Sequence, residues 1–401
     1  MFDLSKLAIS PASLGARLKR ARSSRGLTQE QAASTVGLAR TTLVAIEKGD
    51  RVPSATELNV LAKLYQTELG ELVGRRAIEE SFVPQFRAAV GGSPVAEPAL
   101  EATSRLERYA ANYVALEETN AEPSDRHYPP LMPLPAETAD AEQVGEELAA
   151  SERSRLGLGD APVFDLRAIL EEVVGLRVFV FPMAGAISGI FAYNDRLGGC
   201  IAANANHPPE RRRWTFAHEC AHFLTTRFEP DLFLLPGTRW GKPVAEKLAD
   251  AFATHFLMPR QAVNRRFTEM TSARTNPPVV ADLLKLAHYF GVSVQAMALR
   301  LEDLRRIPVG SWNRLRAHGL KPETARANLG LSTAAPEDER FPSRYRLLAK
   351  RAFDAELISE RALARYFDTD LIGAREELEK LEQLEINAEV PQGGLDQPVS
   401  A

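Results

Sequence analysis

The sequence predicts a mainly α-helical fold with a small mixed β-sheet, and three observations support this prediction. Apolar residues recur at helical spacing over residues 12–76, over residues 99–118 and through most of the chain after residue 210. Alternating β-branched and aromatic residues gather in residues 176–204. The chain has 401 residues, of which 45% are hydrophobic and 25% charged, so two or three domains can each bury a core.

The composition excludes several classes of protein. No run of about 18 uncharged apolar residues is present, so we expect no transmembrane helix. The first ten residues lack a basic segment followed by an apolar one, so we expect no signal peptide. Cys200 and Cys220 are the only cysteines, which suits a reducing compartment and excludes a disulfide-stapled fold. We therefore expect a cytoplasmic protein that does not engage a membrane.

Charge is unevenly distributed along the chain. Residues 1–76 contain 12 Lys+Arg and 7 Asp+Glu, a balance of +5, and subtracting this from the total of −4 leaves −9 for the remainder. A positive field on one small module favours binding to phosphates, whereas the acidic remainder would repel nucleic acid. A nucleic-acid contact is therefore predicted at the N-terminal end.

The apolar periodicity and the turn-rich segments divide the chain into five regions. We expect five short helices within residues 1–76, a linker with one connecting helix in 77–138, an α+β domain in 139–304, a helical region in 305–388, and a disordered tail in 389–401.

The α+β region begins with two helices, at residues 141–157 and 164–174, the second stopped by Gly175. Strands are expected at 176–183, 187–194 and 198–204, with a turn at 195–198 between the last two. After residue 210 we expect helices only, with Ser359 as an N-cap and a long helix at 371–385.

The N-terminal module has the pattern of two short helices that cross closely. Thr28 can cap a helix whose second residue, Gln29, is expected to face the backbone of a DNA duplex. Ala32 and Ala33 are small enough for a close crossing, and Gly37 permits the tight turn that follows.

The next helix, residues 39–48, places Leu43 and Ile46 in the core. Arg40, Thr41 and Ala45 then lie on its outer face, where the first residues of a recognition helix reach base edges in the major groove. Arg40 can pair with guanine, and Thr41 can contact a thymine methyl group or a phosphate.

The segments GLTQEQAA, VGLARTTLVAIEKGDRVPS and LNVLAKLY resemble the Cro/cI (XRE) family of helix-turn-helix regulators over about 60 residues. The resemblance implies a DNA-binding domain in residues 1–76, a double-stranded DNA operator as partner and a homodimer on DNA. The alternative is a small helical bundle that docks proteins, which the apolar Val44 and Ala45 on the outer face favour.

A candidate metal site begins in WTFAHECAHFLTT (residues 214–226), which contains the pattern H-E-x-x-H. Residues i and i+4 share a helix face, so His218 and His222 can direct ring nitrogens at one ion. Glu219 is the candidate general base, because a metal ion lowers the pKa of bound water toward about 7.

EKLADAFATHFLMP (residues 246–259) supplies a second pair at i and i+4. Glu246 would complete a His₂Glu ligand set with an open fourth position. Asp250 would accept a hydrogen bond from the other nitrogen of a ligand histidine. One strand precedes the helix that carries the two histidines, and it contains Gly199, Cys200, Ile201 and Ala202. This strand is our candidate for an exposed edge that pairs with an extended substrate.

These segments, together with IAANANHPPERRRWTFAHECAHFL and LLKLAHYFGVSVQAMALRL, resemble the ImmA/IrrE family of metallopeptidases over residues 139–304. The resemblance implies a zincin-like, gluzincin-type endopeptidase domain that binds Zn²⁺, with Mn²⁺ as the alternative ion. It also implies a catalytic role for Glu219 and a partner repressor or antitoxin as the substrate, in a stress-response, mobile-element or toxin–antitoxin setting. The alternative is a repressor of the antitoxin type whose peptidase-like domain senses a ligand or partner without catalysis.

Several other residues leave alternatives open. Cys200 is either a strand residue or a fourth ligand, and Cys220 is expected to be a core thiol. Candidates for stabilising an oxyanion are His255, Tyr193 and Tyr289. The basic run at residues 211–213 is interpreted as a solvated helix start rather than an anion site. Residues 305–388 could cover the peptidase domain, dimerise or receive a signal.

Overall fold

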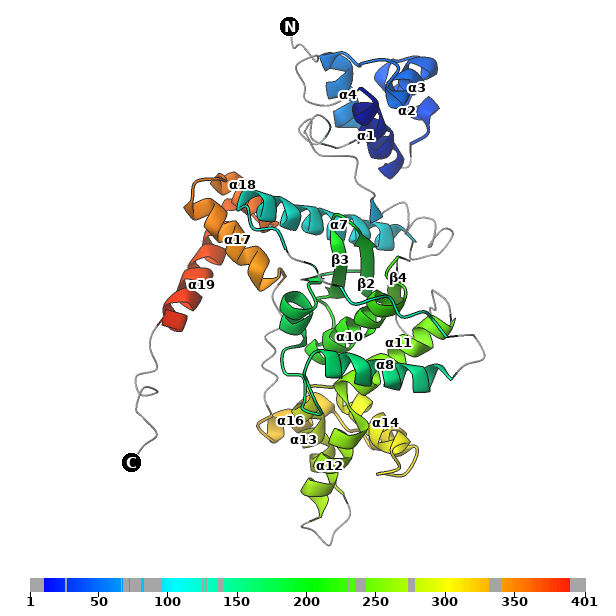
Figure 1. Cartoon of the computed structure of the whole chain (residues 1–401), viewed down its shortest axis with the longest axis vertical. Coiled ribbons are helices and arrows are strands. Elements are labelled where there is room, and N and C mark those ends of the chain that lie inside the picture. Colours follow the sequence, from blue (N-terminus) through cyan, green and yellow to red (C-terminus); the bar gives the residue numbers. More distant parts are fainter. Residues whose placement is uncertain are drawn as a thin grey trace. The chain divides into compact units, whose positions relative to one another are not determined.

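The computed structural model describes residues 11–25, 27–65, 67, 72, 81–82, 96–124, 126, 128–135, 140–228, 231–234, 243–272, 278–331 and 340–389. The chain separates into two compact units, Met1–Val83 and Pro84–Ala401 (Figure 1). Within the described residues, no helix combines the length and the apolar character needed to cross a membrane.

The first unit is a bundle of short helices: α1 (Pro11–Ser24), α2 (Gln29–Val36), α3 (Arg40–Lys48) and α4 (Ala55–Tyr65). Thr28 caps α2 through a capping box with Gln31, as expected, and Gly37 ends α2 in the left-handed conformation with φ of 72°. Leu43 and Ile46 are fully buried against the other helices. The fifth helix predicted in this region falls after Tyr65, where most residues lie outside the described part.

The second unit surrounds a small sheet with helices. Its described elements are α7 (Ala96–Thr119), α8 (Ala141–Arg155), α9 (Leu166–Ala168), the π-helix η2 (Ile169–Val173), β1 (Arg177–Phe181), β2 (Ile187–Asn194), β3 (Gly198–Asn204), α10 (Pro209–Thr225), β4 (Asp231–Leu234), α11 (Pro243–Leu257), α12 (Arg260–Thr271), α13 (Val280–Phe290), α14 (Val294–Asp303), α15 (Ser311–Ala317), α16 (Pro322–Asn328), α17 (Ser343–Asp354), α18 (Glu360–Tyr366) and α19 (Leu371–Glu389).

The four strands of the sheet lie in the order β1-β3-β2-β4. β1 runs parallel to β3, and β2 runs antiparallel to both β3 and β4. This order corrects two predictions. The strand with Gly199, Cys200, Ile201 and Ala202 is β3, which is hydrogen-bonded on both sides and is therefore no edge. The chain after residue 210 also contains one strand, β4, which at four residues is too short for its periodicity to show.

Helices cover both faces of the sheet, and β1 contributes to two layers. Val178 and Val180 join the core formed with α10 and α11. Phe179 and Phe181 point to the other face, where each ring lies within 5.7 Å of the ring of Tyr109 on α7. α17 joins the same aromatic cluster through Tyr345. Because both faces of β1 are covered, all of its residues are buried and they do not alternate between buried and exposed.

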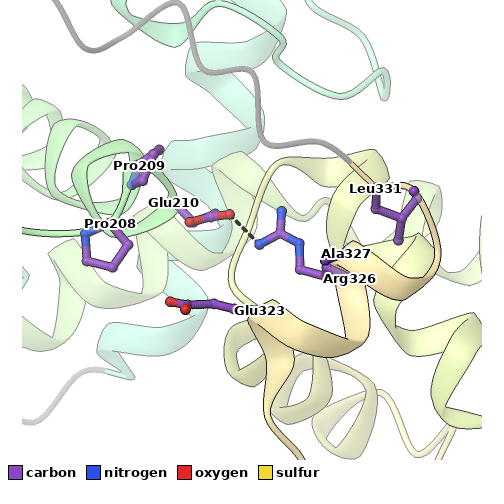
Figure 2. A pocket seen from close by; sticks show the side chains of 8 residues that line it. Pro208, Pro209, Glu210, Glu323, Arg326, Ala327 and Leu331 are labelled. Carbon is purple, nitrogen blue, oxygen red and sulfur yellow. Dashed lines mark hydrogen bonds and ion pairs between the residues drawn. The ribbon is translucent and has the colours of Figure 1, made fainter.

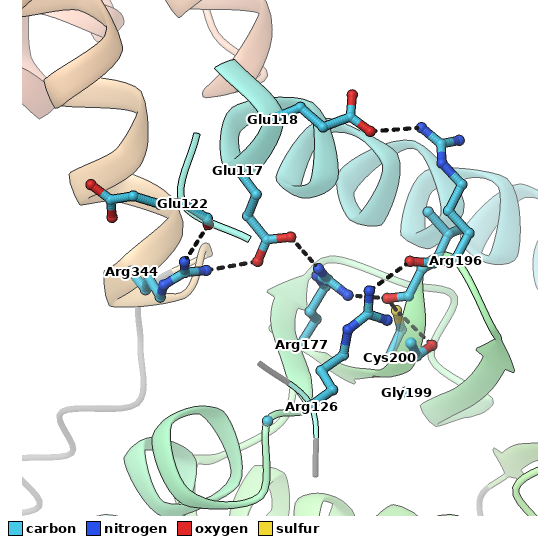
Figure 3. A network of polar contacts seen from close by, with 12 residues as sticks. Glu117, Glu118, Glu122, Arg126, Arg177, Arg196, Gly199, Cys200 and Arg344 are labelled. Atoms are coloured by element: carbon cyan, nitrogen blue, oxygen red, sulfur yellow. Dashed lines mark hydrogen bonds and ion pairs between the residues drawn. The ribbon is translucent and has the colours of Figure 1, made fainter. Parts of the chain in front are cut away.

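A buried carboxylate ties α7 and α17 to the sheet (Figure 3). Glu117 on α7 accepts hydrogen bonds from Arg177 of β1 and from Arg344 of α17, each at 2.7 Å. Both Glu117 and Arg177 are buried, and a buried pair that loses one partner is strongly destabilised. The predicted connecting helix α7 therefore packs as part of the second unit, and α17 covers one face of its sheet. The boundaries proposed for the individual domains stay predictions.

The start of α10 is held by arginines that the sequence analysis expected to be solvated. Arg212 donates to the carbonyl of His207, and Arg213 donates to the carbonyls of Val163 and Phe164. Both guanidinium-bearing residues are buried, so the prediction of an exposed basic run is wrong for them. Paired carbonyl acceptors make their burial tolerable.

A pocket of about 520 Å³ is lined by residues at the start of α10 and in α16. Figure 2 shows Arg326 of α16 reaching Glu210 beside this pocket. The ion pair joins α16 to the first turn of α10.

Candidate metal centre and recognition helix

Helix α10 carries the H-E-x-x-H pattern through the centre of the second unit. Phe216, Ala217, Ala221 and Phe223 are fully buried, so the helix is apolar on several sides at once. His218, Glu219 and His222 are buried on the same helix, with exposed fractions of 1% or less. Such polar groups are stable in a core only when hydrogen bonds or an ion compensate for the lost water.

The structure brings Glu246 of α11 to the two histidines of α10. The Nε2 atoms of His218 and His222 are 3.1 Å apart. The Glu246 carboxylate lies 3.7 Å from each of these nitrogens, with a different oxygen nearer to each ring. The ligand atoms of these three residues all lie within 4.8 Å of one another, and they form a group that could hold a metal ion.

The spacing of these atoms fits a tetrahedral ion. Two ligands about 2.0–2.1 Å from zinc at a tetrahedral angle are separated by about 3.3 Å, and the three observed separations bracket that value. Two imidazoles and one carboxylate are also a ligand set that catalytic zinc sites use. The arrangement therefore fits a divalent ion with three protein ligands.

Each candidate ligand histidine has a partner on its outer nitrogen. Asp250, one turn after Glu246, places Oδ1 3.1 Å from Nδ1 of His218, which is the contact that the sequence analysis predicted. Thr226 places its hydroxyl oxygen 3.3 Å from Nδ1 of His222. With Nδ1 occupied on each ring, Nε2 is turned toward the cluster.

The Glu219 carboxylate lies against β2, at a position where the strand has no side chain. A Cβ atom built on Gly189 would come within 2.8 Å of Glu219 Oε1 and would also collide with the side chain of Thr215. Gly189 is therefore the residue that leaves space for this carboxylate.

Close packing of α8 on α11 supports the second half of the site. A Cβ atom on Gly145 of α8 would lie 2.5 Å from Cβ of Ala251 and 2.9 Å from the backbone nitrogen of Phe252. α8 therefore approaches α11 at the turn that follows Asp250. Any larger residue at 145 would displace the helix that carries Glu246.

The other candidates from the sequence lie outside the cluster. Cys200 contacts the carbonyls of Leu197 and Gly198, and burial raises its pKa to about 12, which is the state of a packed strand residue. Burial also raises the pKa of Cys220 well above its usual range, as expected for a core thiol.

The three candidates for an oxyanion contact have partners of their own. His255 contacts Glu142 and Arg300, each at 3.0 Å. The hydroxyl of Tyr193 donates to Asp195 at 3.0 Å. The ring of Tyr289 is covered by the guanidinium of Arg266.

Three residues beside the site were not predicted from the sequence, namely Thr226, Gly189 and Gly145. Thr226 follows the second histidine by four residues, so its helical spacing is a signal that could have found it. The two glycines matter through neighbours far away in the sequence, and nothing local marks them.

Helix α3 presents the side chains predicted for DNA at the surface of the first unit. Arg40 and Thr41 are exposed, and Ala45 is half-buried. The Arg40 side chain is 63% exposed, with Glu30 at 3.7 Å as a solvated ionic neighbour. α3 is held to α1 by a buried ion pair, in which Glu47 accepts from Arg22 at 2.6 Å.

Gln29 differs from the expectation that its side chain faces the duplex. Its amide nitrogen donates to Glu47 at 2.8 Å, so the side chain is directed into the buried ion pair of the module. Residue 29 follows the Thr28 cap at the start of α2, as expected. Its side chain turns inward because the buried carboxylate of Glu47 is a stronger hydrogen-bond acceptor than water.

Comparison with known domains identifies both parts of the chain. Residues 13–75 match a helix-turn-helix domain, and residues 171–302 match the IrrE N-terminal-like domain of the M78 peptidases. The chain therefore combines a helix-turn-helix domain with an M78 peptidase-like domain. No curated protein is similar to the chain at a significant level.

Two solved structures show only a weak likeness. PlcR of Bacillus thuringiensis, in complex with the peptide PapR7 and DNA, is 12% identical, over 94% of this chain and 97% of its own, with a TM-score of 0.18. The apo competence regulator ComR of Streptococcus vestibularis is 14% identical, over 81% of this chain and all of its own, with a TM-score of 0.16.

Proposed function

We propose that this protein is a DNA-binding transcriptional regulator with a metal-dependent endopeptidase domain that cleaves a partner repressor or antitoxin. The observation that carries the proposal is the convergence of His218, His222 and Glu246 beside Glu219 in one buried site. The match of residues 171–302 to a peptidase-type domain supports the same function.

The proposed chemistry assigns one role to each residue of the site. His218, His222 and Glu246 would hold the ion, with Zn²⁺ as the expected metal and Mn²⁺ as the alternative. The bound ion would supply Lewis acidity that lowers the pKa of a water ligand and polarises a peptide carbonyl. Glu219 accepts the proton of the attacking water at its carboxylate and returns it to the leaving amine. Asp250 orients His218.

An extended substrate needs a free strand edge, and β4 replaces β3 as the candidate. β4 is one of the two outer strands of the described sheet and pairs with β2. The other outer strand, β1, already donates the N–H of Val180 to the carbonyl of Arg340. A peptide added along an outer strand gains backbone hydrogen bonds without displacing an existing strand. The glycine that faces Glu219 lies on the neighbouring strand, β2, which relates this edge to the proposed base.

The first unit is proposed to bind a double-stranded operator as a homodimer, because helix-turn-helix modules commonly pair on DNA. Arg40 and Thr41 would reach base edges, and Ala45 would add an apolar contact. The balance of +5 over residues 1–76 supports this placement.

The decisive experiment combines metal analysis with cleavage for the variant Glu219→Gln. Purified protein loaded with zinc is incubated with the repressor or antitoxin encoded beside its gene, and the products are identified by mass spectrometry. The variant is expected to keep its metal and to cleave at least about 100-fold more slowly. Glu269→Gln, on an exposed helix face, serves as the control. Unchanged cleavage in Glu219→Gln would remove the proposed mechanism.

A second function, a non-catalytic repressor of the antitoxin type, is favoured by the burial of the site. His218 and His222 are at most 1% exposed, and the Glu246 side chain is 19% exposed. A site so enclosed could sense a ligand or a partner instead of admitting a peptide. This hypothesis predicts that the wild type cleaves no partner and that its affinity for DNA changes when the metal binds.

A third function, a scaffold that binds only protein, would leave the exposed face of α3 without a role. It predicts that Arg40→Ala changes neither duplex binding nor its dependence on salt.

A further inference from the structure

We propose that the hydroxyl of Thr226 is a positioning group that sets the proton of His222 on Nδ1 and thereby directs Nε2 at the metal. This inference rests on the metal site of the proposed function. It concerns a residue beyond the H-E-x-x-H pattern, located where α10 ends.

The two candidate ligand histidines differ in the partner of their outer nitrogen. His218 has a carboxylate, with Asp250 Oδ1 at 3.1 Å from Nδ1. His222 has a hydroxyl, with Thr226 Oγ1 at 3.3 Å from Nδ1. A carboxylate can only accept a hydrogen bond, whereas a hydroxyl can donate or accept, so the hydroxyl needs a second contact to decide its direction.

The backbone of α10 supplies that second contact. Oγ1 of Thr226 lies 3.3 Å from the carbonyl oxygen of His222, and a carbonyl oxygen can only accept. The single hydroxyl proton is therefore donated to the carbonyl, and a lone pair of Oγ1 accepts the proton of Nδ1. His222 then carries no proton on Nε2, which is the form that binds a metal ion.

The backbone also holds Thr226 in place. Its own N–H donates to the same His222 carbonyl at 2.7 Å, so the main chain and the side chain of Thr226 close around one acceptor at the last turn of α10. The side chain therefore needs no distant partner to keep its orientation, and its position is set by the helix that carries His222.

Burial makes the two outer contacts unequal. The Asp250 side chain is 59% exposed, so water can replace its oxygen if it is removed. Thr226 is 8% exposed and His222 is 1% exposed, so water has little access to replace a lost hydroxyl beside Nδ1 of His222. A shape-preserving change at Thr226 is therefore expected to weaken metal binding even though the three ligands remain.

The chain offers a matched control one residue earlier. Thr225 is also buried, at 5% exposure, and its hydroxyl donates to the carbonyl of Ala221 at 2.8 Å. Thr225 and Thr226 thus share residue type, burial and a carbonyl acceptor four residues back. Among these contacts, only that of Thr226 includes an imidazole.

The test measures zinc affinity of the full chain by competition with a chromogenic chelator. Thr226→Val is expected to weaken binding about tenfold, whereas Thr226→Ser and Thr225→Val stay within about threefold of wild type. In ¹⁵N-labelled, zinc-loaded wild type, the Nδ1 proton of His222 is expected to give an observable NMR signal, which is lost or broadened in Thr226→Val. If the valine variant does not fold, Thr226→Ala is compared with Thr226→Ser.

Three results would count against the proposal in distinguishable ways. Equal zinc affinity in Thr226→Val and Thr225→Val overturns the role of Thr226 and leaves the metal site intact. An Nδ1 proton that persists unchanged in Thr226→Val also overturns it. A wild type that takes up no zinc removes the metal site, and with it both the proposed function and this inference.

Discussion

Helix α3 of the first unit and helix α10 of the second carry their candidate functional side chains in opposite environments. Arg40 and Thr41 of α3 project into solvent, and the same helix buries Leu43 and Ile46 for its own attachment. In α10, His218 and His222 are themselves in the core. Side chains that contact the bases of a duplex must project into solvent. The affinity of a metal site, by contrast, increases when its ligand side chains are buried and held in one orientation by their neighbours.

The difference predicts how each region responds to substitution. On α3, a change of side chain alters binding while the core stays intact. On α10 and its neighbours, function and stability are carried by the same contacts, so changes should affect both.

The largest effect is expected from loss of the carboxylate ligand. Glu246→Ala should weaken zinc binding by more than about 100-fold, since removal of a partner outside the ligand set already costs 10- to 100-fold. Saturating zinc stabilises a folded unit by about 2.7 kcal/mol at 100 times its Kd. Chelation of zinc should therefore lower the Tm of the second unit in the wild type and leave that of the variant unchanged. A zinc affinity of Glu246→Ala equal to that of the wild type would contradict the role of Glu246 as a metal ligand.

The second effect concerns the space beside Glu219. Gly189→Ala should lower the free energy of unfolding by about 1–3 kcal/mol, because the added methyl group meets the Glu219 carboxylate and Thr215. Gly185→Ala is the matched control, since a Cβ there meets nothing within 4 Å. Urea unfolding of both variants measures the difference. Equal stabilities would show that the core around Glu219 can relax.

The third effect tests the exposed helix. Arg40→Ala should weaken binding to a duplex selected from random sequence by about tenfold at constant salt. Its free energy of unfolding should change by less than about 0.5 kcal/mol, because the side chain is 63% exposed. Fluorescence anisotropy and thermal melting give the two quantities. Lys63→Ala, an exposed charge-matched change on α4, controls for the loss of one positive charge. A large loss of stability in Arg40→Ala would contradict the expectation that substitutions on the exposed face of α3 change binding alone.

The smallest effect is a pH dependence confined to the second unit. Burial, and then the positive charge of Arg300, lower the pKa of His255 below 6.5, although Glu142 and Glu146 act in the opposite direction. Neutral His255 therefore contributes stability that is fully present above pH 6.5 and is lost as the pH falls through the lowered folded-state pKa.

Thermal melts between pH 7.5 and 5 of the wild type and His255→Gln isolate this contribution. On acidification, the Tm of the wild type should fall by more than the Tm of the variant. Residues 1–83 contain no histidine, so the melting of the first unit should change little over this range. A parallel loss in both proteins would exclude His255 as the source.

The sequence was sufficient for features that depend on neighbours along one helix. Thr28 and Gly37 mark the ends of α2 because a side-chain cap and a left-handed residue are local requirements. His218 and His222 share a face because four residues make about one turn. The second pair, Glu246 and Asp250, follows the same rule, and the pattern of the two pairs predicted that they meet.

Features that depend on which segments become neighbours were decided by the tertiary structure alone. β3 was expected at an edge, but its hydrogen bonds on both sides follow from the pairing of β1 and β2 with it. Arg213 carries the charge expected of a solvated turn, yet the carbonyls of Val163 and Phe164, from a distant segment of the chain, make its burial possible. Gly189 matters only because Glu219 lies against it. Helical spacing is a property of one segment, whereas a strand's neighbours, a buried cation's acceptors and the space for a carboxylate belong to pairs of segments that meet only on folding.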